Sequence, residues 1–394
     1  MIVGVPKESF PGERRVALVP AVLPTLTKAG LEVVVEAGAG LESGIRDAEY
    51  AAKGAKLLPD RAAVFAAADI IVQVLCYGSN DLTGKADVPL YHKGQVLIGF
   101  LRPLGNLATV EEIARAGVTS LSIEMMPRTT RAQSMDALSS MATLCGYKAV
   151  LISADLLPKM LPMLTTAAGT ITPARVLVIG AGVAGLQAIA TARRLGAVVH
   201  AYDVRSAVKE QIESLGAKFV VLDIDAAAAE DKGGYAKALG EEFYKKQREL
   251  LKEVIREQDV LITTAAVPGK KAPILVTAEM ASAMSPGSVI VDIAAERGGN
   301  CELTRAGETV VHQGINILGP VNMASDVPFH ASQMYASNVT SFLKLMVTKE
   351  GALNVNREDE IIRETLVTSG GEVVHARVVE LMGLTPAAPA GGGR

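Results

Sequence analysis

Short runs of β-branched and apolar residues alternate with segments of helical periodicity along the first third of the chain. The runs lie at residues 2–5, 32–36, 70–75, 95–99 and 118–122, and a helix is expected at about 20–29. Strands separated by helices are typical of a parallel, doubly wound α/β sheet. A long, mostly helical stretch over 134–163 follows, and we expect it to act as a hinge or spacer.

A second alternating series begins at residue 174 and has the pattern of a complete nucleotide-binding sheet. Helices are expected at 183–195 and 208–215, and strands at 175–179, 198–202, 218–221, 260–263, 289–292 and 315–318. The segment 331–382 reads as two helices with a break near Gly351 and no sheet of its own, so we expect it to pack on the first domain.

The pattern therefore predicts two Rossmann-like, doubly wound parallel-sheet domains with a cleft between them. The first is discontinuous, with residues 1–137 and 329–394, and the second covers 138–328. Residues 225–235 are poor in core-forming side chains and end in a glycine pair, which indicates a mobile surface loop or an extension of the helix that follows. The Pro/Ala/Gly tail at 384–394 is not expected to pack.

Composition excludes several classes of function. With 42 acidic and 39 basic side chains and 4% aromatic residues, the chain has neither the charge nor the stacking groups expected of a nucleic-acid-binding protein. The odd number of cysteines favours a reducing compartment with inert or buried thiols. The first residues do not resemble a signal peptide. The most apolar window, 149–170, is interrupted by Asp155, Pro158, Lys159 and Pro162, so we expect no membrane span.

A glycine-rich turn carries the first functional signal. Gly180, Gly182 and Gly185 follow an expected strand and open a helix, a spacing that permits close approach to a pyrophosphate. Asp203 ends the next strand, where a carboxylate accepts hydrogen bonds from a ribose 2′-hydroxyl and favours NAD(H) over NADP(H). Arg205 weakens that preference, although we expect it to be a solvated or adenine-stacking side chain.

Two further turns, 263–269 and 292–299, follow later strands of the same series. Each has the composition of an ordinary turn, but the carboxyl ends of parallel strands share one edge, which favours a single cleft. The five histidines are scattered without metal-ligand spacing, so they are expected to be structural or surface groups and no metal site is predicted.

A polar cluster precedes the long helix at the expected domain junction, and it contains Arg128, Gln133, Asp136 and Ser139. One interpretation is helix capping by Ser134 or Asp136. The alternative is that an arginine, an amide and a carboxylate face a nicotinamide ring across the cleft.

With these motifs the chain resembles domain I, the NAD(H)-binding subunit, of proton-translocating nicotinamide nucleotide transhydrogenase, over residues 4 to about 346. The motifs that carry the resemblance are Gly4-Val-Pro-Lys-Glu8, Arg128 with Arg-Ala-Gln-Ser-Met-Asp136, Leu-Ser-Ser140, Gly-Ala-Gly-Val-Ala-Gly185, Tyr202-Asp-Val-Arg205, Gly233-Gly-Tyr-Ala-Lys237, Val267-Pro-Gly269 and Gly298-Gly-Asn-Cys301.

The resemblance implies direct hydride transfer between NAD(H) on this chain and NADP(H) on a partner. Ser139 and Arg128 would fix the carboxamide, Asp136 would orient Arg128, and Gln133 would reach toward the second nucleotide. Direct transfer needs orientation and water exclusion instead of a general acid or base. The implied cofactor contacts are Gly180, Gly182, Val183, Ala184, Gly185, Asp203, Val204, Arg205, Tyr235, Thr264, Ala265, Pro268 and Gly269, with Tyr235 on a loop that closes over the nucleotide.

The resemblance also implies an assembly. Domain I of the family is a homodimer that docks on a membrane-spanning domain II and an NADP(H)-binding domain III. The chain is thus expected in the cytoplasm, held on the inner (plasma) membrane by its partners, with the spanning part a separate polypeptide.

The chain also resembles alanine dehydrogenase, in fold, in Arg15 within Glu13-Arg-Arg-Val-Ala17, in Asn322-Met323 and in the turn at 292–299. The substrate-site lysine and histidine of that enzyme fall at Leu75 and Arg102, which leaves oxo-acid reduction without its acid/base pair. Arg15, which contacts the substrate carboxylate in alanine dehydrogenases, shows either ancestry or a structural ion pair here, and Glu296 is similarly ambiguous. A third hypothesis is a non-catalytic NAD(H)-sensing module.

Overall fold

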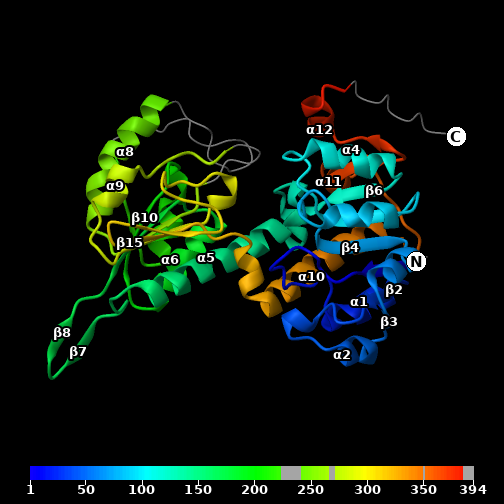
Figure 1. Ribbon diagram of the computed structural model, residues 1–394, viewed down its shortest axis with the longest axis horizontal. Helices are drawn as coiled ribbons and strands as arrows, with labels where there is room; N and C mark the ends of the chain where they lie inside the picture. The colour runs from blue at the N-terminus through cyan, green and yellow to red at the C-terminus, as the bar shows by residue number, and fades with distance from the viewer. Residues whose placement is uncertain (223–240, 266–270, 349–350, 385–394) are drawn as a thin grey trace. The chain divides into compact units, whose positions relative to one another are not determined.

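The computed structural model describes residues 1–222, 241–265, 271–348 and 351–384 (Figure 1). The chain divides into two compact units, Met1–Met141 with Ser325–Arg394, and Ala142–Ala324. Each unit contains a mostly parallel sheet with helices, so the predicted α/β class with Rossmann-like parallel sheets is confirmed.

The first unit is built on an eight-stranded sheet in the order β17-β16-β6-β5-β4-β1-β2-β3. Its strands β1 to β6 are parallel, and both of its central strands β4 and β5 are buried runs of apolar residues, as expected when helices cover both faces of a sheet. The strands are β1 Ile2–Val5, β2 Glu32–Glu36, β3 Lys56–Leu58, β4 Ile70–Leu75, β5 Val96–Phe100, β6 Thr119–Ser122, β16 Leu366–Ser369 and β17 Glu372–Val373.

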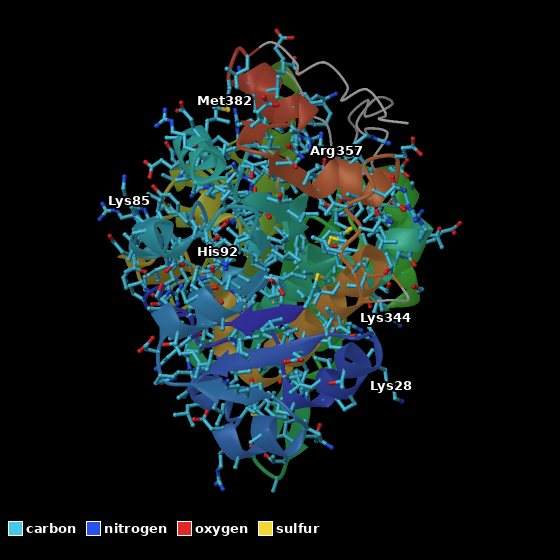
Figure 2. The ribbon with its side chains drawn as sticks, turned by 90° about the vertical axis from the view of Figure 1, so that its right-hand side faces the viewer. Lys28, Lys85, His92, Lys344, Arg357 and Met382 are labelled. Atoms are coloured by element: carbon cyan, nitrogen blue, oxygen red, sulfur yellow. The ribbon has the colours of Figure 1, made fainter. Side chains whose placement is uncertain are left out.

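Helices and an outer layer of charged side chains complete this unit. The helices are α1 Leu23–Lys28, α2 Asp47–Ala52, α3 Arg61–Ala67, α4 Leu107–Arg115, α10 Pro328–Met346, α11 Glu360–Thr365 and α12 Ala376–Leu381. Lys28, Lys85 and Lys344 point outward (Figure 2). The buried face of α10 includes Tyr335, whose hydroxyl donates to the carbonyl oxygen of Gln73 at 2.6 Å. This bond ties the C-terminal segment to the end of β4.

The expectation that 331–382 consists of two helices is wrong, although the segment has no sheet of its own, because its two strands join the sheet of the first unit. Residues 366–369 form β16, which pairs antiparallel with β6, and β17 pairs with β16. Leu366 and Val367 of β16 are buried between β6 and the edge strand β17. The tight turn between the strands uses Gly370 and Gly371, both with positive φ, which is the backbone that two-residue hairpin loops favour.

The second unit has a seven-stranded sheet in the order β11-β10-β9-β12-β13-β15-β14. Apart from the antiparallel edge strand β14, this is the strand order of a dinucleotide-binding domain, with its topological switch point between β9 and β12. The strands are β9 Arg175–Ile179, β10 Val198–Tyr202, β11 Lys218–Phe219, β12 Val260–Thr263, β13 Val289–Asp292, β14 Thr309–His312 and β15 Ile315–Leu318. The predicted strands 175–179, 198–202, 260–263, 289–292 and 315–318 are confirmed.

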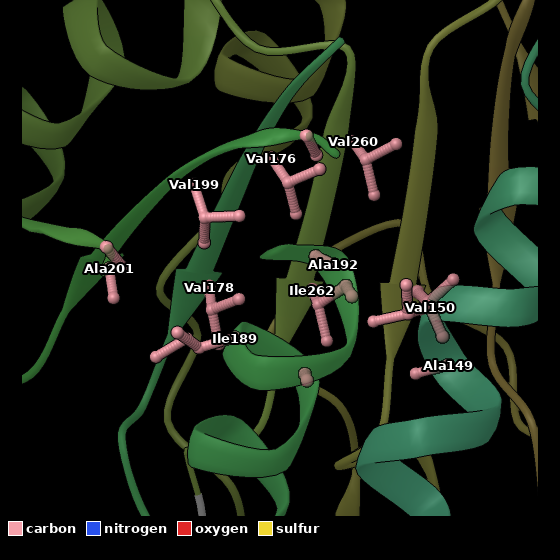
Figure 3. Packing of buried hydrophobic residues seen from close by; sticks show 14 of the residues in the cluster. Ala149, Val150, Val176, Val178, Ile189, Ala192, Val199, Ala201, Val260 and Ile262 are labelled. Atoms are coloured by element: carbon pink, nitrogen blue, oxygen red, sulfur yellow. The ribbon is translucent and has the colours of Figure 1, made fainter. Parts of the chain in front are cut away.

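Helices cover both faces of the second sheet, namely α6 Val183–Arg194, α7 Lys209–Ser214, α8 Glu241–Arg256 and α9 Ala278–Ser282, together with part of α5 Ala137–Leu156. On one face, Val178 and Ile262 of the sheet pack with Ile189 of α6 and with Ala149 and Val150 of α5 (Figure 3). Burying these aliphatic side chains is the main source of stability for the sheet and its helices.

The helix expected over 134–163 is shorter than predicted. It ends at Leu156, two residues before Pro158, and residues 164–171 form an isolated hairpin of β7 Leu164–Thr166 and β8 Gly169–Ile171. Proline removes a backbone donor and restricts the residue before it, which explains the end of the helix. By length and composition alone α5 is apolar enough to cross a membrane, the one such helix in the described part of the chain, but a core helix passes the same test.

Candidate cofactor-binding site

The glycine-rich turn lies between β9 and α6 at the switch point of the second sheet. Gly180 has φ +98°, a conformation that side chains disfavour, and a Cβ on Gly185 would lie 1.8 Å from the carbonyl oxygen of Gly180. A Cβ on Gly182 would meet nothing within 4 Å, and no described side chain caps α6 at this residue. The first N–H groups of α6 thus remain available to an anion.

The turn after β12 supports the glycine-rich turn from the neighbouring strand. The Thr264 N–H donates to the Ile179 carbonyl oxygen at 2.9 Å, and its hydroxyl donates to the Gly180 carbonyl oxygen at 3.0 Å. Thr264 and Ala265 therefore lie beside the turn, as the sequence predicts for strand ends on one edge. Val183 and Ala184 form the first residues of α6.

Asp203 lies just beyond the end of β10 and faces the same turn. Its Oδ2 accepts from the Ala181 N–H at 2.7 Å, which ties the carboxylate to the glycine-rich turn. Arg205 donates from its backbone N–H and its Nε to Oδ1, each at 2.9 Å, and from Nη2 to Oδ2 at 2.9 Å. The side chains of Asp203 and Arg205 are only 5% and 13% exposed, so of the two expectations for Arg205 the solvated side chain is wrong and adenine stacking stays a prediction. A carboxylate two residues away binds this guanidinium in a charge-assisted, two-point contact.

Asp292 and Asn300 stabilise the third turn, and their roles were not foreseen. The buried Asp292 Oδ2 accepts from the N–H groups of Asn300 and Cys301 at 2.7 and 2.9 Å, and from the Thr304 hydroxyl at 2.8 Å. The Asn300 amide donates to the carbonyl oxygens of Ala265 and Pro273 at 2.8 and 2.9 Å. Asn300 thus joins the residues on either side of segment 266–270. The sequence signal for these roles is the motif Gly298-Gly-Asn-Cys301.

Asp136 is the N-cap of α5. Its Oδ1 accepts from the Ser139 N–H at 2.9 Å and its Oδ2 from the Ser139 hydroxyl at 2.6 Å, which is the capping interpretation of the polar cluster. Arg128 and Gln133 are exposed on the preceding segment. Neighbouring Arg131 forms a two-point ion pair with Asp359 at 2.6 Å. Asp136 therefore caps the helix, while the exposed side chain of Gln133 is accessible to a ligand.

Three predicted cofactor residues, Tyr235, Pro268 and Gly269, lie outside the described residues, as does the loop expected at 225–235. The three cysteines are free thiols, and Cys76 and Cys301 are buried. Burial raises the pKa of the Cys301 thiol to about 11, so this thiol stays protonated and unreactive at neutral pH.

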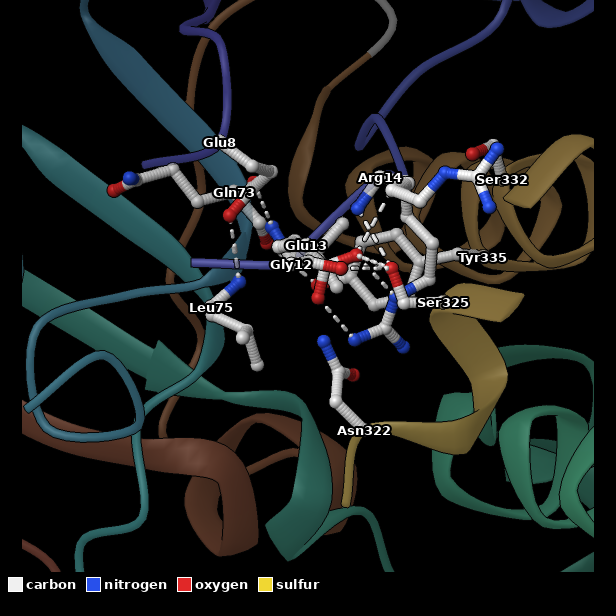
Figure 4. A network of polar contacts seen from close by, with 12 residues as sticks. Glu8, Gly12, Glu13, Arg14, Gln73, Leu75, Asn322, Ser325, Ser332 and Tyr335 are labelled. Carbon is white, nitrogen blue, oxygen red and sulfur yellow. Dashed lines mark hydrogen bonds and ion pairs between the residues drawn. The ribbon is translucent and has the colours of Figure 1, made fainter. Parts of the chain in front are cut away.

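Arg15 forms an ion pair in the first unit, which agrees with the interpretation of this residue as part of a structural ion pair. Its Nε and Nη2 donate to Glu13 at 2.7 and 2.6 Å. The Ser325 hydroxyl donates to the same carboxylate at 3.1 Å, and Figure 4 shows Glu13 and Ser325 together. Both charged side chains are almost completely buried. The nearby Glu8 carboxylate accepts from the Val74 N–H at 2.6 Å, and burial together with the charge of Glu13 raises its pKa to about 8.

Neither position aligned with the alanine dehydrogenase acid/base pair carries such a group. Leu75 is an apolar, half-buried residue at the end of β4. Arg102 is exposed and has φ +52°, and its N–H and that of Leu101 donate to the half-buried Glu124 carboxylate. Glu296 accepts a hydrogen bond from the Asn322 N–H at 2.5 Å, so within the second unit it holds the backbone at residue 322.

Comparisons with known proteins agree on one family. The models "Alanine dehydrogenase/PNT, N-terminal domain" and "Alanine dehydrogenase/PNT, C-terminal domain" match residues 4–145 and 149–376. A protein of Rhodospirillum rubrum that is named as a portion of NAD(P) transhydrogenase subunit alpha is 48% identical over 381 residues, 95% of this chain and 98% of that protein. A crystal structure of transhydrogenase from Sinorhizobium meliloti superimposes with a TM-score of 0.82 at 44% identity, over 96% of this chain and 100% of that one. Alanine dehydrogenase of Bacillus subtilis is 30% identical, over 97% of this chain and 95% of that protein.

Proposed function

The chain belongs to the alanine dehydrogenase/PNT family, and on that premise we propose that it is the NAD(H)-binding component of a proton-translocating transhydrogenase. The reaction is NADH + NADP⁺ ⇌ NAD⁺ + NADPH, with NADP(H) held by a partner domain. Similarity to proteins named as transhydrogenase subunits, at 48% identity against 30% for alanine dehydrogenase, favours this function over oxo-acid reduction.

The observation that carries the cofactor proposal is the turn at Gly180–Gly185 beside Asp203. The residues fit a dinucleotide, because the turn has room over Gly182, an uncapped helix start for a pyrophosphate, and a carboxylate at the end of β10. Val183, Ala184, Thr264 and Ala265 border it, and Val204, Arg205, Tyr235, Pro268 and Gly269 complete the proposed contacts.

Bound NAD(H) supplies the hydride, and the side chains orient the ring. We assign the carboxamide contacts to Ser139 and Arg128. Asp136 orients these groups and already accepts two hydrogen bonds from Ser139. The exposed Gln133 extends toward the second nucleotide. These groups act by position, since a hydride moving between two rings requires no proton at the reacting carbon.

The Arg15–Glu13 ion pair argues against alanine dehydrogenase as the function. In this structure Nε and Nη2 of Arg15 donate to Glu13, and Leu75 and Arg102 supply no acid/base pair for an imine. The carboxylate of an oxo-acid substrate would have to displace Glu13 from Arg15, and so break a buried, two-point ion pair.

The proposed assembly is a homodimer that docks on a membrane-spanning domain II and an NADP(H)-binding domain III at the cytoplasmic face of the inner membrane. The β7–β8 hairpin supports a second copy as one partner. A lone two-stranded hairpin is marginally stable in water, and Met163, Leu164 and Ile171 are 64%, 40% and 44% exposed on it or beside it.

The test mixes the purified chain with an NADPH-loaded domain III and an NAD⁺ analogue whose reduced form absorbs at a different wavelength from NADPH, and it follows reduction of the analogue spectroscopically. A parallel sample contains NADH, pyruvate and ammonia without domain III. Hydride exchange only with domain III supports the transhydrogenase. Pyruvate turnover by the chain alone would overturn it in favour of alanine dehydrogenase, and NADH binding without either reaction would leave the sensing module.

A further inference from the structure

A single glycine inside helix α5 meets the start of α6 backbone to backbone. A Cβ on Gly146 would lie 2.0 Å from the Ala184 carbonyl oxygen and 2.8 Å from its carbonyl carbon, closer than any real Cβ contact. The partner atom is backbone, so it has no flexible end with which to move aside. Alanine is the more stable residue in a helix interior, which makes a buried glycine here a cost that this contact explains.

The contact is fixed on both sides. One turn further along α5, Ala149 and Val150 are buried in the same core as Ala188 and Ile189 of α6, so α5 cannot slide along α6 without disturbing packed side chains. From the other side, the Thr264 hydroxyl donates to the Gly180 carbonyl oxygen at 3.0 Å.

Between these supports lies the glycine-rich turn. A Cβ on Gly185, the residue after Ala184, would itself lie 1.8 Å from the Gly180 carbonyl oxygen. Backbone therefore packs on backbone from Gly146 through Ala184 and Gly185 to Gly180, and a displacement of Ala184 moves the uncapped N–H groups of α6.

We propose that Gly146 and Thr264 clamp the phosphate-binding turn, and that Gly146 is a positioning residue for the pyrophosphate of NAD(H). Gly146 touches the first turn of α6 and not the nucleotide. The inference rests on the proposed function, because it presupposes that a dinucleotide binds at Gly180–Gly185.

Gly146→Ala tests the proposal through the ligand's phosphates. We expect the dissociation constant of NADH and of ADP-ribose to rise about tenfold, equivalent to losing about one charge-assisted hydrogen bond, while that of adenosine, which lacks phosphates, stays within about twofold. A merely structural defect would weaken all three ligands together. Calorimetry measures the three affinities.

Tyr147→Ala is the matched control, because Tyr147 is the next residue of α5 and is 39% exposed. It should bind all three ligands as the wild type does. Thermal unfolding checks that each variant is folded. If Gly146→Ala does not fold, Thr264→Val takes its place, since it removes the hydroxyl that donates to the Gly180 carbonyl oxygen. It should weaken NADH and ADP-ribose binding but leave adenosine binding unchanged.

The outcomes separate the two proposals. A wild-type chain that binds no NADH contradicts the proposed function and this inference with it. Wild-type binding together with unchanged NADH and ADP-ribose affinity in Gly146→Ala, or with an equal loss for adenosine, overturns the inference alone.

Discussion

At the scale of residues, the structure ties Asp203 to the glycine-rich turn and to Arg205 at once. Asp203→Ala removes the acceptor of the Ala181 N–H and frees a guanidinium for a 2′-phosphate. We expect weaker NAD(H) binding and a smaller preference over NADP(H), measured by titration with both. Asp203→Ala/Arg205→Ala is the control, in which NADP(H) binding should fall again. Unchanged NAD(H) affinity in the single variant would remove Asp203 from the ribose site.

Gln133 is the residue whose proposed role depends most on reaching a second nucleotide. Gln133→Asn shortens the side chain by one methylene without changing its chemistry. Binding of NAD(H) should stay within a few fold, while hydride transfer falls about 10²-fold, because misplacement of about 1 Å has that effect on a reactive geometry. Stopped-flow mixing with domain III separates the two quantities. Full transfer activity would show that Gln133 does not organise the reactive complex.

Glu8 predicts a pH dependence of stability in the first unit. Its pKa in the fold is about 8 against 4.5 in the unfolded chain, because burial and Glu13 disfavour the carboxylate. The folded state therefore binds the extra proton, and the stability it confers is complete below about pH 4.5 and is lost as the pH rises toward 8. Between these pH values, the free energy of unfolding measured with urea should fall by up to about 1.4 kcal/mol per pH unit. Glu8→Gln should flatten that slope, and an equal slope in the variant would refute the assignment.

At the scale of elements, the success of prediction depends on where each strand lies along the chain. Strands β9, β10, β12, β13 and β15 coincide with the predicted ranges because each is a β-branched run between a helix and a turn. The missed strands β7, β8, β14, β16 and β17 lie in hairpins, whose signal is a local turn such as Gln313-Gly314 or Gly370-Gly371. The missed strand β3 has three residues and pairs parallel with β2 at the edge of its sheet. Periodicity over longer windows does not register them.

The candidate site divides in the same way. Glycine spacing predicts the turn itself, because backbone conformation depends on local residue type. The Arg205–Asp203 pair and the Asn300 bridge could not be predicted, since each depends on which of several possible partners a side chain reaches after the chain has folded.

The β7–β8 hairpin gives the prediction that belongs to this scale. Replacing 164–171 by a short Gly-Ser linker removes exposed strands that pack in neither core, so the fold should survive while dimerisation is lost. Light scattering after size exclusion measures the mass. Met163→Ser, which keeps the hairpin but removes its most exposed apolar side chain, should weaken the dimer without abolishing it. A dimer that persists in the deletion variant would place the interface elsewhere.

At the scale of the whole molecule, the two units have separate cores, and the chain passes from one to the other within α5 and again near residue 325. Separate cores predict two unfolding transitions, because each sheet can lose its packing without exposing the core of the other. The proposed nucleotide contacts around Gly180 and Asp203 belong to the second unit, whereas Glu8 belongs to the first. ADP-ribose lacks the nicotinamide ring that is assigned to Arg128 and Ser139 of the first unit. At about 100 times its dissociation constant it should therefore stabilise one transition by about 2.7 kcal/mol, and Glu8→Gln should alter the pH dependence of the other. Differential scanning calorimetry of the wild type and the variant, with and without ADP-ribose, resolves the two transitions. A single transition that responds to both changes would mean instead that α5 couples the units into one cooperative structure.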